Sequence, residues 1–268
     1  MSTSLPQITM QEQIHACPRG TPGFPLCHPE KVMQSTPPPA ETPAPAPPLL
    51  GIDTCGPTGS VALGRFHDGQ IQILGQIELE GRSYSATLVA AVADLLSQNH
   101  VELNNIAAIV AVNGPGSFTG VRVGLSAVKG LAEPAQIPVV AVSRLEILAH
   151  KSGVPSAAID AHRHEVFLRL DSPPSAVREL LAGPTDLATL APPPRIAVCD
   201  DAAAGLITAA WPTTELLRTP APSAADALQL AAPRFAARKF VDLALLDGHY
   251  LRRSDAEIFG EPVTPQHT

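Results

Sequence analysis

The chain has 268 residues, of which 45% are hydrophobic and 4% aromatic, and its formal net charge is −7 at pH 7. A chain of this length and apolar content can bury a sizeable core, so we expect a globular protein. Its longest apolar runs fall well short of the roughly 20 residues that a membrane span needs. Its N-terminus lacks the basic cluster and apolar region of a secretory signal. We therefore expect no membrane association and a cytoplasmic location.

The acidic balance of the chain argues against direct binding of nucleic acid. A net negative charge repels phosphodiester backbones unless a basic face is segregated from the rest of the surface. The sequence contains no run rich in lysine or arginine, and few aromatic side chains are available to stack on bases. If RNA matters to this protein, we expect another subunit to hold it.

Residues 1–48 form a proline-rich tail, which is most crowded in prolines at its end. Proline removes backbone donors and fixes φ, so we expect this stretch to be extended or disordered. A tail or linker is favoured over a proline-rich docking motif. His15, Cys17, Cys27 and His28 lie in this tail without the CxxC pair of a zinc site, and a metal cluster is therefore not expected. All four cysteines of the chain are interpreted as reduced thiols.

From residue 49 the pattern changes to that of a folded domain. Residues 49–53 and 60–66 are short apolar runs that predict a hairpin, and residues 70–79 predict a third antiparallel strand. Residues 83–98 carry apolar side chains at helical spacing. Residues 106–112 form a continuous apolar run, which is typical of a strand buried on both faces.

A second helix over residues 119–132 and a fifth strand over residues 138–142 complete this first unit. The order strand, strand, strand, helix, strand, helix, strand is typical of the ribonuclease H-like fold. That fold occurs in the actin, hexokinase and heat-shock-chaperone superfamily, whose members carry two such units. We therefore predict an α/β protein with two ribonuclease H-like units.

The second unit is expected to be reduced, because it is short and interrupted by prolines. A helix is predicted near residues 144–151 and strands over residues 157–160, 165–170 and 195–198. A late helix over residues 223–240, in which Pro233 could introduce a kink, is expected to return to the first domain. The expected organisation is a disordered tail (1–48), a first domain (49–149 with 223–243), a reduced second domain (150–222) and a C-terminal tail (244–268).

A glycine-rich loop is the most informative segment. Residues 114–124 read GPGSFTGVRVG and open the second helix, whose first N–H groups are free to hold an anion. Close packing of the helix on the sheet explains the glycines equally well. A GxxxxGK[ST] phosphate loop is not present. The candidate anion or nucleotide loop consists of Asp53, Gly114, Gly116, Ser117, Thr119 and Gly120.

This segment closely resembles the TsaB family, known also as YeaZ, whose hallmark is a GPGSFTG loop followed by a GLxxAKGLA-like helix. The resemblance extends to GIDT and SVAL at residues 51–54 and 60–63, DAHRHEVF at 160–167, YLR at 250–252 and DAE at 255–257. Together these motifs cover residues 49 to 257, and the tail before them has no equivalent. Departures from the family pattern are Cys55-Gly56 in place of Ser-Thr, Tyr84 in place of His, His162 in place of Arg and His164 in place of Gly.

The resemblance implies a non-catalytic subunit in the synthesis of N6-threonylcarbamoyladenosine in tRNA. It implies that the homologous subunit TsaD performs the transfer, that the ATPase TsaE joins the pair, and that tRNA is reached only through this complex. No cofactor and no metal are expected for the chain itself. The two helices of the first domain would contact TsaD, and the same apolar face makes a homodimer plausible when TsaD is absent. The expected interface residues are Tyr84, Ser85, Leu88, Val89, Val92, Leu95, Val121, Leu125 and Val128.

An ATP-binding or metallopeptidase-like enzyme of the same superfamily is the alternative. A peptidase of this kind needs a helical HxEGH pair, which the sequence lacks. His162 and His164 are expected to face the same side of a strand, but no third ligand is apparent, so a surface pair is favoured. Asp53 could order Mg²⁺ for an ATPase, whereas a carboxylate that caps its own turn is the favoured interpretation.

Overall fold

The computed structural model of the chain describes residues 47–67, 69–81, 83–171 and 176–252. Residues 1–46 of the proline-rich tail, with its histidines and cysteines, and the DAE motif at residues 255–257 lie outside these ranges, whereas Pro48 at the end of the tail already belongs to the first strand. Within them, no helix is long and apolar enough to cross a membrane.

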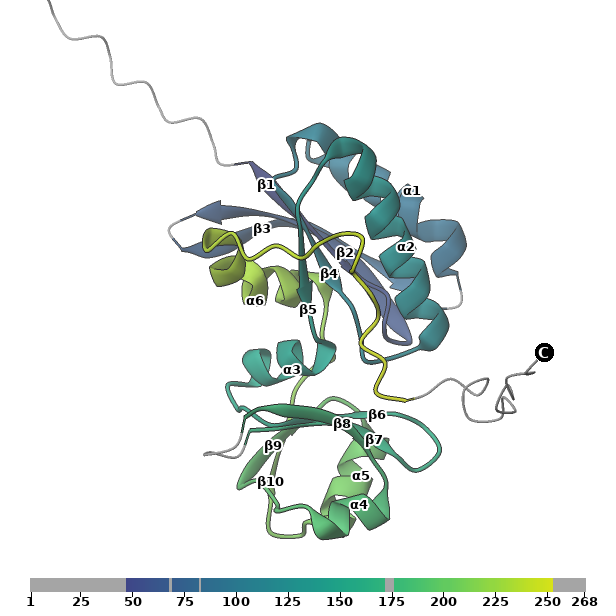
Figure 1. Cartoon of the computed structure of the whole chain (residues 1–268), viewed down its shortest axis with the longest axis vertical. Helices are drawn as coiled ribbons and strands as arrows, with labels where there is room; N and C mark the ends of the chain where they lie inside the picture. The colour runs from purple at the N-terminus through teal and green to yellow at the C-terminus, as the bar shows by residue number, and fades with distance from the viewer. Residues whose placement is uncertain (1–46, 68, 82, 172–175, 253–268) are drawn as a thin grey trace, which may run out of the picture. The chain divides into compact units, whose positions relative to one another are not determined.

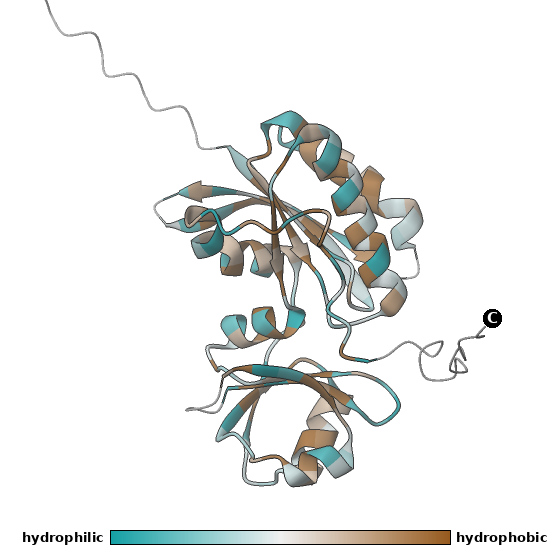
Figure 2. Ribbon diagram, in the orientation of Figure 1, coloured by the Kyte–Doolittle hydropathy of each residue, from teal (hydrophilic) through white to brown (hydrophobic). Residues whose placement is uncertain are grey.

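The first sheet has five strands in the order β3-β2-β1-β4-β5. Its strands are β1 (Pro48–Asp53), β2 (Thr58–His67), β3 (Gln70–Glu80), β4 (Ala108–Val112) and β5 (Val139–Val142). β1, β2 and β3 pair antiparallel, and β4 and β5 add in parallel beside β1. Every residue of β1 and β4 is buried, which matches the apolar run of β4 and the largely apolar sequence of β1 before Asp53 (Figure 2). The predicted order of elements is therefore confirmed for this unit.

Three helices cover the two faces of this sheet (Figure 1). They are α1 (Tyr84–Gln98), α2 (Phe118–Ala135) and α6 (Ala224–Ala236). α1 packs on β2 and β3, and α2 packs on β4 and β1. α6, which comes from the far end of the sequence, contacts all five strands on the other face. Its Ser223 cap and Asp226 form a capping box, and Ser60 of β2 accepts a hydrogen bond from the Ala224 N–H at 2.8 Å.

The second sheet repeats this arrangement with shorter elements. Its order is β10-β9-β6-β7-β8, again with two antiparallel and two parallel pairings. The strands are β6 (Ala157–Asp160), β7 (Val166–Leu170), β8 (Arg178–Ala182), β9 (Arg195–Val198) and β10 (Glu215–Arg218). The helices are α3 (Arg144–Ser152), α4 (Pro184–Thr189) and α5 (Asp201–Ala210). Two units of one topology, the second reduced in the length of its elements, agree with the predicted fold class.

Successive side chains of β6 point to opposite faces of the second sheet, so this unit has two small hydrophobic cores. Ala157 and Ile159 pack with Leu145 and Leu148 of α3. Ala158, between them, packs with residues of α4 and α5 on the other face. α3 also contacts α6, so it touches elements of both units.

Several elements of the second unit were not predicted from sequence. These are β8, α4, α5 and β10. β8 and β10 are short strands whose side chains, apart from the buried Ala182, are intermediate or exposed, and half of the residues of α5 are alanine. The late helix also ends at Ala236 rather than at residue 240. Arg238 adopts a left-handed φ of 52°, which is incompatible with a continued right-handed helix.

Glycines allow α2 and its preceding loop to touch the end of β1. A Cβ at Gly120 would lie less than 3.0 Å from the carbonyl oxygen of Thr54, and a Cβ at Gly116 would meet the carbonyl oxygen of Cys55 equally closely. The Thr54 hydroxyl donates to the Gly120 carbonyl at 2.7 Å, and the Ser117 N–H donates to the Cys55 carbonyl at 2.8 Å. Gly114 has a φ of 115°, which favours glycine. The close-packing explanation of these glycines is thus supported by direct contacts.

Two alanine substitutions in α2 separate close packing from helix propensity. Gly120→Ala forces a methyl group onto a backbone carbonyl and is expected to lower the free energy of unfolding by about 1–3 kcal/mol. A Cβ at Gly130 meets no atom within 4 Å. Gly130→Ala is therefore expected to raise the free energy of unfolding by about 0.5–1 kcal/mol. Urea denaturation measures both, and effects of the same sign would contradict this view of the helix.

Candidate functional site

The end of β1 places a buried carboxylate beside the glycine loop. Asp53 is completely buried, and its Oδ1 accepts a hydrogen bond from the Cys55 N–H at 2.8 Å. This is the turn-capping role favoured for Asp53 from sequence. The other oxygen, Oδ2, has no hydrogen-bond partner within the described ranges. One carboxylate oxygen of Asp53 therefore has a hydrogen-bond donor within its own turn, and the other has no donor among the described residues.

Arg144, the first residue of α3, faces this carboxylate. Its side chain is 4% exposed, and its Nε lies 3.6 Å from Asp53 Oδ2. That separation is an ion pair but too long for a hydrogen bond, and both atoms are without a hydrogen-bond partner among the described residues. Burial alone lowers the pKa of Arg144, but the nearby Asp53 charge raises it, and the net shift is upward. The guanidinium therefore stays charged although it is buried.

Gly56 and Tyr84 complete the surroundings of the guanidinium. A Cβ at Gly56 would lie less than 3.0 Å from Arg144 Nη2 and Cζ, so the absence of a side chain makes room for the charged group. The Tyr84 hydroxyl donates to the Gly56 carbonyl at 2.7 Å and fixes this turn. Burial, followed by the charge of Asp53, raises the pKa of Tyr84 to about 12. Tyr84 therefore remains a neutral hydrogen-bond donor.

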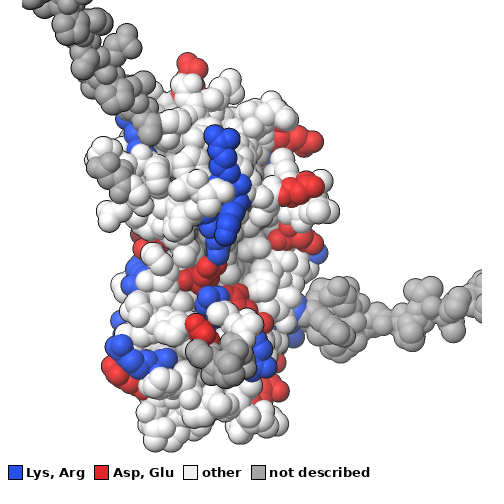
Figure 3. Space-filling view, turned by 60° about the vertical axis from the view of Figure 1, so that its left-hand side comes forward, with Lys and Arg blue, Asp and Glu red and all other residues white. Residues whose placement is uncertain are grey.

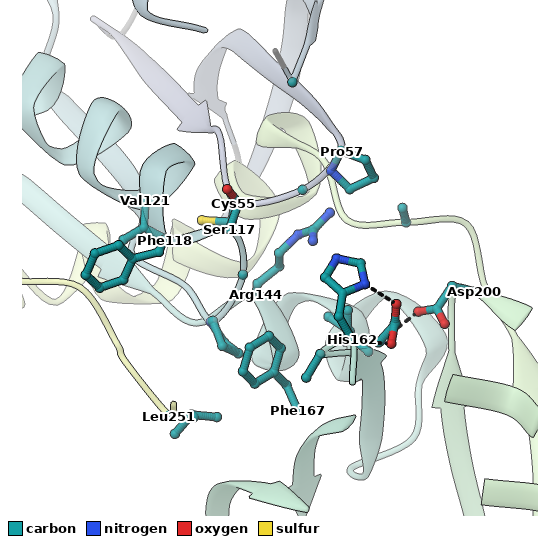
Figure 4. A pocket seen from close by; sticks show the side chains of 18 of the residues that line it. Cys55, Pro57, Ser117, Phe118, Val121, Arg144, His162, Phe167, Asp200 and Leu251 are labelled. Carbon is teal, nitrogen blue, oxygen red and sulfur yellow. Dashed lines mark hydrogen bonds and ion pairs between the residues drawn. The ribbon is translucent and has the colours of Figure 1, made fainter. Parts of the chain in front are cut away.

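A cavity of about 1060 Å³ opens in front of Arg144. Its walls come from the ends of β1 and β6, the glycine loop and the residues after 248 (Figure 4). Cys55 and Cys199 both line it as free thiols. Burial raises the pKa of Cys199 to about 11, so its thiol is protonated at neutral pH. Asp160 and Asp200 lie on the opposite wall, where their carboxylates accept backbone N–H donors.

Glu179 of β8 joins three parts of the chain. It accepts hydrogen bonds from the Ser143 hydroxyl at 2.6 Å and from Arg169 at 2.8 Å, and it pairs with the His249 ring at 2.9 Å. The backbone N–H of His249 also donates to the Asn113 carbonyl at 2.7 Å. Burial alone raises the pKa of Glu179, but its hydrogen bonds from His249, Ser143 and Arg169 outweigh burial and hold the pKa below its ordinary value. This carboxylate therefore links β8 to the C-terminal segment.

The turn between β6 and β7 contains three successive left-handed residues. His162, Arg163 and His164 have φ values of 59°, 57° and 58°. Such conformations cost about 1–2 kcal/mol each outside glycine. The prediction that both histidines face one side of a strand is wrong, because they lie in this turn and not in a strand. His162 Nδ1 lies 2.9 Å from Asp160, and no group of three metal-ligating side chains occurs within the described ranges.

The residues predicted for a partner interface divide into two groups. Ser85 and Val89 are exposed, Val89 to the extent of 59%. The others pack inside the first unit and present no side chain to a partner in this structure; they are Tyr84, Leu88, Val92, Leu95, Val121, Leu125 and Val128. Amphipathic spacing marks the face that is buried, and here the sheet itself buries that face.

The candidate anion loop is brought together around the end of β1. Gly116 and Ser117 line the cavity, Gly114 and Gly120 are buried, and Thr119 is exposed at the start of α2. The Ser117 hydroxyl accepts the Gly120 N–H at 3.3 Å, so it caps the helix. Sequence reasoning missed Arg144, Glu179 and His249. Their partners lie far away in the chain, and no local pattern distinguishes them from exposed polar residues.

Comparisons with known proteins agree with one another. The family model of TsaD, the tRNA N6-adenosine threonylcarbamoyltransferase, matches residues 74–180. The tRNA threonylcarbamoyladenosine biosynthesis protein TsaB of Escherichia coli is 38% identical over 125 residues, covering 44% of this chain and 52% of that protein. TsaB of Bacillus subtilis is 36% identical over 126 residues, covering 46% and 54%. The chain thus spans about half the length of the curated relatives it matches.

Solved structures extend the likeness to about three quarters of this chain and nearly the whole of the matched chains. A crystal structure of an uncharacterized Pseudomonas aeruginosa protein with similarity to peptidase YEAZ is 30% identical, with a TM-score of 0.61. The likeness covers 76% of this chain and 99% of that one. The structure of YeaZ from Pseudomonas aeruginosa is 28% identical, with a TM-score of 0.59 and the same coverage.

The hydrogen bonds of Glu179 predict a pH-dependent loss of stability. A carboxylate with a lowered folded-state pKa contributes stability above its ordinary pKa, near 4.5, and that contribution is lost as the pH falls through the folded value. We expect Glu179→Gln to cost about 1–3 kcal/mol at pH 7 and progressively less below pH 4.5. Glu215→Gln, in an exposed pair with Arg195, should change little. Chemical denaturation across this pH range measures the difference, and a constant gap would contradict the assignment.

Relief of backbone strain in the β6–β7 turn is also testable. His164→Gly is expected to raise the free energy of unfolding by about 0.5–1 kcal/mol, since glycine adopts positive φ without penalty. His164→Val, a β-branched residue, should lower it. Thermal unfolding of the three proteins ranks them, and a glycine variant less stable than the native chain would refute the strain.

Proposed function

Because this chain belongs to the TsaB (YeaZ) family, we propose that it is a non-catalytic scaffold subunit required for N6-threonylcarbamoyladenosine modification of tRNA. In this role it pairs with a TsaD transferase, and the ATPase TsaE joins the pair. The match to the TsaD family model supports a partner of related fold. tRNA is held by the complex and not by this chain alone.

The observation that carries this proposal is the outer face of α1 and α2. These helices bury most of their large apolar side chains against the sheet, and small side chains are exposed around Val89; Phe118, at the start of α2, is also exposed. Val89 is the large apolar side chain exposed on α1. Ser85, Ala86, Ala90 and Ala93 surround it on α1, and Ser126 and Gly130 are exposed on α2. Small side chains let a second pair of helices approach closely, which suits a helix-to-helix interface.

This assignment refines the interface predicted from sequence. We propose that the contact residues lie on the outer side of α1 and α2. Of the interface residues predicted from sequence, only Ser85 and Val89 lie there. Substitution of Leu88 or Val92 would test folding, because both side chains lie in the core. The same outer face makes a homodimer of the isolated chain a continuing prediction.

The surface charge supports an indirect contact with tRNA. On the face shown in Figure 3, lysine and arginine side chains form a narrow column with acidic groups beside and below it. A narrow column neutralises few phosphates, and the chain carries a net charge of −7. RNA binding is therefore assigned to the partner.

An enzyme of the same superfamily remains the alternative, and Asp53 is the observation that favours it. Its Oδ2 has no hydrogen-bond partner among the described residues, and it lies beside the glycine loop. Reconstitution decides between the two functions. The family resemblance also implies a fourth enzyme, which makes the threonylcarbamoyl-adenylate donor. The chain, TsaD, TsaE and this enzyme are combined with unmodified tRNA, and each protein is omitted in turn. We expect modification to need every component, and transfer by this chain alone would establish the enzyme.

The interface is tested by a charge placed on the outer face. Val89→Glu is expected to weaken binding to TsaD by at least roughly tenfold, because pairing would bury an uncompensated charge. Leu245→Glu is the matched control, since Leu245 is 79% exposed and lies outside both helices. Calorimetry with purified TsaD measures both affinities. Equal affinity of the two variants would remove this face from the interface.

A further inference from the structure

The buried guanidinium of Arg144 includes a donor that no acceptor satisfies. An arginine side chain carries five N–H donors, and the Nε of Arg144 has no hydrogen-bond partner within the described part of the chain. Its ion-pair partner is Asp53, at 3.6 Å from Nε. Burial of such a group without acceptors is costly, so an arginine in this state indicates a site that a further acceptor completes.

The free edge of the guanidinium faces the cavity. Nε lies on the side of Asp53, and the two terminal nitrogens lie against Gly56, which has no side chain to cover them. Figure 4 shows the Arg144 side chain reaching into the space between Pro57 and His162. Arg144 and Gly56 both line a cavity of about 1060 Å³, so the Nη1–Nη2 edge lies at the cavity wall. That volume is sufficient for a small organic ligand.

We propose that this cavity binds a small molecule through a carboxylate group held by the terminal nitrogens of Arg144. A carboxylate is planar and matches two parallel N–H donors of a guanidinium in a bidentate pair. The assignment is independent of the scaffold function above, because it concerns a ligand of this chain alone.

Charge favours a carboxylate over a phosphate. Asp53 already places one negative charge beside Arg144, and both groups are buried. A singly charged carboxylate adds one further charge, whereas a phosphate near neutral pH brings up to two and repels Asp53 more strongly. The Asp160 and Asp200 carboxylates on the opposite wall act in the same direction, and Arg252, which also lines the cavity, is already paired with Glu165.

The remaining wall suits an apolar body attached to the carboxylate. Phe118 and Phe167 line the cavity together with Leu251 (Figure 4). Phe118 also packs against Tyr250, with ring centroids 5.1 Å apart, so this wall is held in place. The strained turn at His162 lies on the same cavity, and strain of this kind concentrates at ligand sites. Apolar side chains beside a small number of oriented polar groups are the usual composition of a small-molecule site.

The test compares three probes on the native full-length chain. Phenylacetate carries a carboxylate on an aromatic body, phenyl phosphate carries a phosphate, and 2-phenylethanol carries no charge. Saturation-transfer NMR titrations give a dissociation constant for each. We expect phenylacetate to bind at least tenfold more tightly than either of the others. Absence of phenylacetate binding, equal binding of 2-phenylethanol, or tighter binding of phenyl phosphate each overturns the proposal.

Substitutions then test whether the carboxylate of the ligand binds to Arg144. The double variant Asp53→Asn with Arg144→Met removes both charges together, so that no unpaired buried charge is left to unfold the chain. It is expected to bind phenylacetate at least tenfold more weakly, with thermal unfolding checked in parallel. Arg218→Met, at an exposed arginine outside the cavity lining, is the control and should bind as the native chain does. Native-like binding by the folded double variant overturns the assignment.

A measurement on the native chain covers the case in which the double variant does not fold. The guanidinium ¹⁵N resonances of Arg144 report directly on a new acceptor at its terminal nitrogens. We expect them to shift on addition of phenylacetate while those of Arg218 stay unchanged. Binding of phenylacetate without a shift at Arg144 overturns the proposal.

Discussion

The approach of the glycine loop to the end of β1 is the contact on which the rest of the structure depends. The backbone carbonyl of Thr54 lies where a Cβ of residue 120 would be, and the backbone carbonyl of Cys55 lies where a Cβ of residue 116 would be. Because these are backbone atoms, neither side can give way without moving a strand or a helix. This contact fixes where α2 starts and how it lies on the sheet. It therefore determines both the outer face of α1 and α2 and the place of Asp53 beside the cavity.

Patterns within a short stretch of sequence predicted the first unit well. β4 is a continuous apolar run, β1 is largely apolar up to Asp53, and α1 has a clear apolar stripe, so period and length were sufficient. The second unit depends on shorter elements. β10 has four residues with mixed exposure, and such a segment has no period to detect. Its pairing with β9 supplies the stability that its own sequence does not.

The cavity was predicted only in part for a related reason. Asp53 and the glycine loop belong to local motifs, so their proximity to one another was visible in the sequence. Arg144 is an ordinary charged residue at the start of a helix, where an exposed position is the default expectation. Its burial arises because Gly56, far away in the chain, leaves room for the guanidinium. The same spacing argument that found the helices α1 and α2 assigned their inner residues to a partner, since periodicity identifies an apolar face but not what covers it.

The return of α6 to the first sheet has a consequence during synthesis. The five strands of that sheet are complete at Val142, but the helix that covers one of their faces begins only at Ala224. At typical translation rates of about 5–20 residues per second, α6 is synthesised several seconds after the last strand, and that face of the sheet stays uncovered during this time. The nascent chain then exposes an apolar sheet surface while the whole second unit emerges. A chaperone that shields such surfaces would act during this interval. The interval ends when the first turn of α6 packs against Gly51 of β1.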